Sequence, residues 1–153
     1  MGRYQGSYRG EKGQNLVKFS MVRTPRSLAR KARHHRLHQA VARVVDDLPT
    51  EVRHLLTEVA IVVEDEPSSV HLDDAGLEPG DELFGLYQGI PLTERGSSYS
   101  LVTPDRIIIF AGPLERTYGS RREFDEQIRV TVLHELGHHL GFDENGLDML
   151  GLS

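Results

Sequence analysis

The sequence contains no cysteine and no long run of apolar residues. Without cysteine, disulfides and thiolate ligands are both excluded, so any metal must be held by imidazole and carboxylate groups. No apolar stretch approaches the roughly 20 residues of a membrane-spanning helix, and the first residues lack the apolar core of a secretory signal. We therefore expect a soluble protein without a membrane partner, and its composition suits a reducing, cytoplasmic location.

Charge is divided unevenly along the 153 residues. Residues 1–43 hold eleven Lys or Arg and one acid, a net charge of +10, whereas residues 44–153 hold seven basic and twenty-two acidic residues, a net charge of -15, which together give -5. The first 26 residues are rich in Gly and Arg without periodicity, which is typical of a disordered tail or an added segment. We expect a basic, flexible N-terminal arm, residues 1–35, and one folded domain, residues 36–153.

Residues 23–43 carry much of the positive charge into a helical pattern. Such a segment is able to dock on nucleic acid or another polyanion. The alternative, slightly favoured because no aromatic residues are interleaved to stack on bases, is an arm that folds over the acidic body of the same molecule. His34 and His38 share a helix face there. Because the adjacent arginines repel a cation, we expect a plain surface helix and no second metal site.

The remaining pattern predicts an α+β fold. Apolar residues at helical spacing predict a helix over 37–48, which Pro49 interrupts, and a short helical turn follows it. Runs of branched and aromatic residues predict three strands, and loops separate them. The predicted strands are 59–63, 83–88 and 106–110, residues 68–82 are a predicted loop, and a linker is expected after Gly112-Pro113. We expect a small twisted sheet covered by the first helix and by one C-terminal helix.

The C-terminal helix carries the most informative motif, His134-Glu135-Leu136-Gly137-His138. On a helix, residues four apart lie about 40° from each other on one face, so both imidazoles can bind one metal ion. Glu135 lies beside them and is free to accept a proton from a metal-bound water. Ser120 and Glu123 have the spacing of a capping box, which predicts where this helix begins.

A third ligand is expected just after the helix. Gly141 is suited to end the helix in a left-handed conformation, which turns the chain back under the metal. Asp143 and Glu144 come directly after that turn. A carboxylate from this segment would complete a set of two histidines and one carboxylate, with a fourth position left for water.

Several separate blocks resemble one known family. They are Val59–Pro67 (VAIVVEDEP), Leu86–Gly96 (LYQGIPLTERG), Pro104–Ile107 (PDRI) and Val132–Gly141 (VLHELGHHLG). These blocks are similar to the short bacterial minimal-zincin, metallopeptidase-like family, and the resemblance extends from about Leu37 to the C-terminus without covering the basic arm. It implies a reduced zincin-like fold, a small mixed sheet packed against an N-terminal helix and the metal-binding helix. It also implies a zinc metallopeptidase, a hydrolase whose substrate is generally unassigned.

The chain departs from the family pattern at one ligand position. The family's motif resembles His-Glu-x-x-His-x-x-Gly-x-x-Asp, and Glu144 stands here in place of the final Asp. Glutamate is one methylene longer and still able to bind zinc, so we take Glu144 as the third ligand, with Asp143 and His139 as alternatives. His139 points about 100° away from His138 on the helix. We therefore expect it to pack against the core or to support the site.

These residues lead to a predicted mechanism. Zinc held by His134, His138 and a carboxylate would activate a water for attack on a peptide or protein substrate, with Glu135 as the general base. Tyr87 and Tyr99 are candidates to stabilise the oxyanion, although packing is the more common role of such tyrosines. A sheet edge beside the cleft is suited to hold an extended peptide.

Two other classes of function stay open. The first is a zinc-binding protein without peptidase turnover, in which the metal has a structural role. The second is a nucleic-acid- or ribosome-associated module that uses residues 23–43. The basic segment and the metal site are also compatible with each other in one protein.

Overall fold

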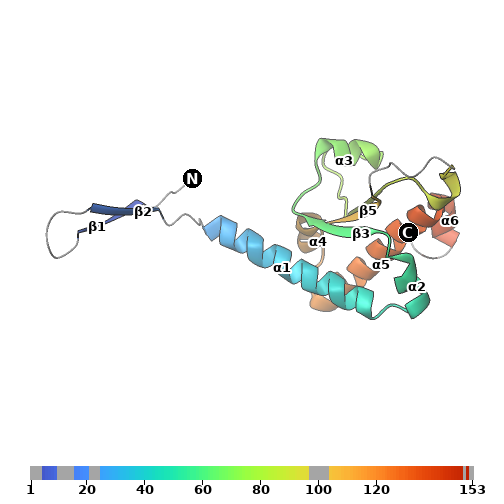
Figure 1. Cartoon of the computed structure of the whole chain (residues 1–153). Coiled ribbons are helices and arrows are strands. Elements are labelled where there is room, and N and C mark those ends of the chain that lie inside the picture. Colours follow the sequence, from blue (N-terminus) through green and yellow to red (C-terminus); the bar gives the residue numbers. More distant parts are fainter. Residues whose placement is uncertain (1–4, 10–15, 21–24, 97–103, 150, 152–153) are drawn as a thin grey trace. The chain divides into compact units, whose positions relative to one another are not determined.

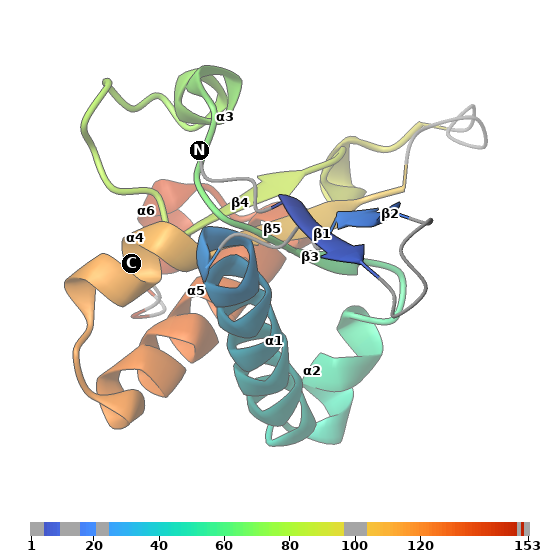
Figure 2. The same cartoon turned by 90° about the vertical axis from the view of Figure 1, so that its left-hand side faces the viewer.

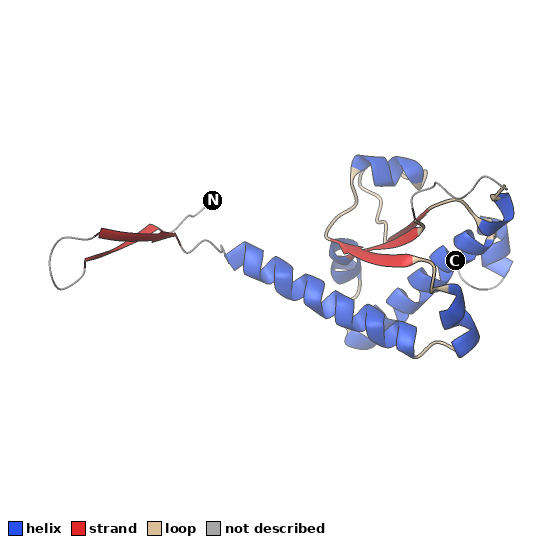
Figure 3. Ribbon diagram, viewed as in Figure 1, coloured by secondary structure: helices blue, strands red, loops and turns tan. Residues whose placement is uncertain are grey.

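The computed structural model describes residues 5–9, 16–20, 25–96, 104–149 and 151. The chain divides into two compact units, Met1–Arg33 and His34–Ser153, and each is described by itself. Figure 1 labels the helices and strands, and Figure 3 colours them by type. No helix in the described part of the chain is both long enough and apolar enough to cross a membrane.

The first unit contains a hairpin. Strand β1 (Gln5–Arg9) pairs with β2 (Leu16–Ser20) in antiparallel orientation. The expectation of no regular structure in the first 26 residues is therefore wrong for these two segments. Residue types that favour strands, such as Val17 and Phe19 in β2, are few in this stretch. The polar average composition of the first 26 residues therefore gave no indication of a strand.

The second unit contains a mixed sheet of three strands. Strands β3 (Ala60–Glu64), β4 (Gly85–Gln88) and β5 (Arg106–Phe110) lie in the order β3-β5-β4. Strand β3 is parallel to the central strand β5, and β4 is antiparallel to it, with Tyr87 opposite Ile107. The three predicted strands are confirmed to within two residues. Among the described strands, β4 is an edge strand that pairs with β5 alone. Its opposite edge faces helix α5 (Arg121–Leu140), because the amide of Tyr87 donates to Glu135 of that helix.

Two long helices cover one face of the sheet. Helix α1 (Pro25–Asp46) contains most of the predicted helix and begins earlier, with proline at its first position. Helix α5 (Arg121–Leu140) begins at the predicted capping box of Ser120 and Glu123 and ends at Gly141, whose φ is 96°. Figure 2 shows α1 and α5 on the same side of the sheet. Apolar side chains of both helices form one core with β3 and β5. The expected α+β arrangement of a small sheet against these two helices is confirmed.

Three short helices were not predicted. Helix α3 (Ser69–Asp74) lies in the segment predicted as a loop, and α4 (Ala111–Thr117) lies where a linker was expected. Helix α6 (Glu144–Met149) follows α5, and α2 (Thr50–Leu55) matches the predicted turn. The loop and linker predictions were wrong because helices of six or seven residues depend on caps and on packing rather than on a periodic sequence.

The opposite face of the sheet has a smaller core. Leu86, Ile108 and Phe110 are buried there, and three residues of α3 and the following turn pack against them. These three residues are Leu72, Ala75 and Leu77. The segment that carries α3 thus covers this face of the sheet, and it also lines part of the cleft described in the next section.

Candidate metal centre

Helix α5 places the two motif histidines together. His134 and His138 are half-buried, and their Nε2 atoms lie 3.2 Å apart. The Nδ1 atom of His138 lies 3.1 Å from the carbonyl oxygen of Phe142. Because a carbonyl only accepts hydrogen bonds, Nδ1 of His138 carries the hydrogen, and Nε2 keeps its lone pair for a ligand in the cleft. The turn at Gly141 brings Phe142 into this position.

Glu144 completes a group of three possible ligands. Its Oε1 lies 3.0 Å from Nε2 of His138, and its Oε2 lies 3.6 Å from Nε2 of His134. Two ligands at about 2.0–2.1 Å from a tetrahedral zinc are separated by about 3.3 Å. The distances of 3.0, 3.2 and 3.6 Å are close to that value, although the two Glu144 distances belong to different carboxylate oxygens. One ligand atom from each residue lies within 4.8 Å of the other two, so the donor set fits a zinc ion. In the described part of the chain, His134, His138 and Glu144 form the group able to hold a metal.

Asp143 has a different role in the structure. Its Oδ1 accepts a hydrogen bond of 2.8 Å from the amide of Gly146, so Asp143 caps the first turn of α6. Glu144, one residue later, has an exposed side chain that reaches back to the histidines. The structure therefore brings Glu144, and not Asp143, to the histidine pair.

Glu135 lies between helix α5 and strand β4. The residue is 7% exposed, and its Oε2 accepts a hydrogen bond of 2.8 Å from the amide of Tyr87. Burial raises the pKa of Glu135, while the charges of His134 and His138 and the Tyr87 amide act in the opposite direction. A bound cation would also favour the ionised carboxylate, which is the form that accepts a proton.

His139 points away from the histidine pair. It is 2% exposed, and its Nδ1 lies 3.2 Å from Oδ2 of Asp105 and 3.3 Å from the Tyr87 hydroxyl. Burial, and then the charge of Arg95, lower the pKa of His139. The structure thus places His139 in a supporting position. Sequence reasoning gave no role to Asp105 and Arg95, because only the fold brings them beside His139.

A cleft of about 520 Å³ contains the proposed ligands and the proposed base. Its walls are β4, the end of α3 with the turn after it, and the segment from Gly141 to Glu144. His134, Glu135, His138 and Glu144 all line it, so the structure brings the predicted ligands and the predicted base to one cavity.

The other sequence candidates have separate positions. Tyr87 lines the cleft, but its hydroxyl contacts His139. Tyr99 lies outside the described residues. His34 contacts Asp65 through Nε2 at 2.6 Å, and in the described ranges neither His34 nor His38 belongs to a group of three possible metal ligands.

Comparison with known protein families identifies a match for this chain. A solved structure of a conserved hypothetical protein from Thermus thermophilus is 21% identical, with a TM-score of 0.45, and the match covers 78% of this chain and 98% of that one. A search of curated proteins found no match. The family model described as zincin-like metallopeptidase matches residues 56–152, as the sequence blocks led us to expect. The chain therefore belongs to the zincin-like metallopeptidase family.

Proposed function

We propose that the protein is a zinc-dependent peptidase that hydrolyses peptide bonds with Glu135 as its general base. Membership of the family implies a metal. The observation that carries the proposal is the cluster of His134, His138 and Glu144, whose possible ligand atoms lie within 4.8 Å of one another, with a buried carboxylate beside it. Three protein ligands leave a fourth position, which is the arrangement of a catalytic rather than a structural zinc site.

Each residue then has a definite task. A zinc ion in this site would acidify a bound water and polarise a peptide carbonyl. Glu135 would accept a proton from the attacking water as its oxygen bonds to the carbonyl carbon, and would give that proton to the amide nitrogen as the C–N bond breaks. The amide of Tyr87 holds the Glu135 carboxylate at the wall of the cleft, where this transfer needs it.

Strand β4 supports a peptide as the substrate. The amide of Phe110 donates to the carbonyl of Phe84. The backbone N–H and C=O groups of the even-numbered residues at this end of β4 therefore point toward β5. The amide of Tyr87 faces the other way, toward Glu135. The edge of β4 opposite β5 lines the cleft, where Glu135 occupies the amide of Tyr87, and an extended peptide would lie along this edge beside the proposed catalytic groups.

Replacing Glu135 with Gln tests the proposal. We expect Glu135→Gln to keep stoichiometric zinc, measured by elemental analysis, and to cleave a fluorogenic peptide library at least about a hundredfold more slowly, because the general base is lost. Glu126→Gln is the matched control, since Glu126 is exposed on the same helix and does not line the cleft. Unchanged cleavage by Glu135→Gln would exclude Glu135 as the base. A zinc-loaded wild type that cleaves nothing in the library would favour the alternative of a zinc-binding protein without turnover.

A second candidate function is docking on a polyanion, such as nucleic acid, through residues 23–43. Lys31, which is exposed on α1, favours it, whereas Arg36 and Arg43 contact Glu115 and Asp125. We expect binding of duplex RNA to weaken steeply with salt, and Arg30→Gln/Lys31→Gln to reduce that slope by about one or two. Binding that is independent of salt would contradict this candidate.

A further inference from the structure

A largely buried polar tetrad lies beside the proposed metal site, where the end of β4 meets the C-terminal turn of α5. We define it as Tyr87 of β4, Arg95, Asp105 and His139 of α5. Asp105 is 3% exposed and contacts the guanidinium of Arg95, and the Nε atom of Arg95 donates to the carbonyl of Ile90 at 3.0 Å. His139 lies between Asp105 and the Tyr87 hydroxyl at 3.2 and 3.3 Å. Three neighbouring positions between residues 87 and 105 and one residue of α5 therefore meet in one hydrogen-bonded group.

The tetrad is close-packed around the end of β4. The rings of Tyr87 and His139 meet edge to face, with centroids 5.6 Å apart. A Cβ atom added at Gly89 would lie 2.2 Å from a carboxylate oxygen of Asp105 and 2.5 Å from the Tyr87 hydroxyl. A buried ion pair is costly to desolvate and is stabilising only when its hydrogen bonds are satisfied, so these groups have little freedom to move.

Tyr87 connects the tetrad to the proposed base. Its amide donates to Glu135 at 2.8 Å, and its hydroxyl contacts His139. Glu135 and His139 are four residues apart on α5 and therefore lie on one face of that helix. Tyr87 is thus held at its amide by Glu135 and at its hydroxyl by His139, two residues one helical turn apart on α5. A shift of the Tyr87 side chain therefore moves the amide that holds Glu135.

We propose that Tyr87 and His139 are positioning residues, which fix β4 against α5 and so hold the Glu135 carboxylate in the cleft. The inference rests on the proposed function of Glu135, but it makes a separate statement about the Tyr87 amide. Neither residue needs to touch the metal or the substrate. His139 positions Glu135 indirectly, through its contacts with Tyr87 and Asp105.

Zinc-loaded Tyr87→Phe tests this with three measurements. Loss of the hydroxyl should speed hydrogen exchange of the residue 87 amide about tenfold relative to the β5 amides, which is the effect of about one hydrogen bond. It should lower kcat about tenfold. KM and zinc content should stay unchanged. Tyr118→Phe is the control, because Tyr118 packs against Phe84 and does not contact the tetrad.

His139 variants provide a rescue test. His139→Asn keeps an N–H near the position of Nδ1 and should retain most of the exchange protection and kcat, whereas His139→Leu should lose both. Equal loosening of residue 87 and of β5, or a kcat for Tyr87→Phe that matches Tyr118→Phe, would overturn the proposal. If the wild type shows no peptidase activity, the proposed function fails, and the exchange measurement alone still decides whether the tetrad holds Glu135.

Discussion

At Gly85, strand β4 and helix α5 approach too closely for a side chain. A Cβ atom there would lie 2.4 Å from Cγ2 of Thr131 and 3.4 Å from Cγ of Glu135. We expect Gly85→Ala to lower the free energy of unfolding by about 1–3 kcal/mol, because α5 must move away from the strand. Urea denaturation measures this change. Gly96→Ala is the control, since no atom lies within 4 Å of its added Cβ, and equal stability of the two variants would contradict the close approach.

Glu144 and Asp143 are adjacent acids with different expected effects. Glu144→Ala removes one of three proposed ligands, so we expect zinc affinity to fall by about tenfold or more with little change in stability of the metal-free protein. Asp143→Ala removes the cap of α6 and should cost about 1 kcal/mol of stability while zinc affinity is largely retained. Isothermal titration with zinc and thermal unfolding of the metal-free protein measure the two effects. Reversed effects would make Asp143 the ligand.

The proposed ligands were accessible to sequence reasoning because their geometry is local. His134 and His138 share a face of any helix that contains them, and Gly141 with Glu144 follows within one turn. The tetrad was not accessible, because Asp105 and Arg95 lie in separate segments. A buried ion pair depends on which segments the fold brings together, and no spacing in the sequence encodes that.

At the scale of elements, prediction succeeded where residue type or period dominates. The branched run Ile107–Ile109 is fully buried in the central strand, and the capping box of α5 forms as expected. Helix α3 was missed although Ser68 and His71 form a capping box, because the N3 residue is histidine rather than the usual glutamate or glutamine. Helix α4 was missed because Gly112 and Pro113 usually interrupt regular structure.

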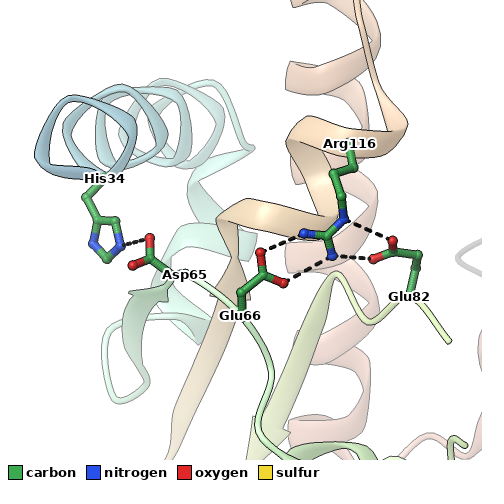
Figure 4. Close-up of polar contacts among 5 residues, drawn as sticks. All are labelled: His34, Asp65, Glu66, Glu82 and Arg116. Atoms are coloured by element: carbon green, nitrogen blue, oxygen red, sulfur yellow. Dashed lines mark hydrogen bonds and ion pairs between the residues drawn. The ribbon is translucent and has the colours of Figure 1, made fainter. Parts of the chain in front are cut away.

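One arginine fastens both ends of the segment that carries α3. Arg116 of α4 donates to Glu66 at 2.6 and 3.1 Å and to Glu82 at 3.2 and 3.0 Å (Figure 4). The two carboxylates raise the pKa of Arg116. Residues 67–81 between these acids cover one face of the sheet and line one wall of the cleft. The Arg116 guanidinium therefore joins the two ends of this segment, and we call this arrangement the Arg116 clamp. Each contact is partly exposed and is therefore screened by salt.

Arg116→Ala should loosen this segment without unfolding the protein. We expect hydrogen exchange in residues 67–81 to rise by about fivefold, and by less at high salt, because the variant loses two surface ion pairs. Peptide KM should increase while kcat stays unchanged, since the segment forms a wall of the cleft and carries none of the proposed catalytic groups. Arg121→Ala is the control, because Arg121 has one weak contact of 3.9 Å to Asp125. Exchange that rises equally in both variants would contradict the clamp.

At the scale of the whole molecule, the cleft differs electrically from the rest of the domain. Outside the cleft, several acids contact basic partners, as in the pairs Asp65–His34, Asp125–Arg43 and Asp105–Arg95. The described residues that line the cleft include Asp74, Glu94 and Asp143 but no Lys or Arg. A divalent ion would balance Glu135 and Glu144, and the three other carboxylates would still leave the cleft negative. Such a field attracts positive ligands and repels negative ones.

If the proposed peptidase activity is present, we therefore expect the zinc-loaded protein to prefer cationic peptides. At low ionic strength, kcat/KM for a peptide flanked by Lys should exceed that of the same peptide flanked by Glu by about tenfold, and the ratio should shrink as salt screens the field. Glu94→Gln should reduce this ratio, because Glu94 lines the cleft, whereas Glu51→Gln, on the distant helix α2, should leave it unchanged. A ratio that is the same at low and high salt would mean that direct contacts, and not the charge of the cleft, select the substrate.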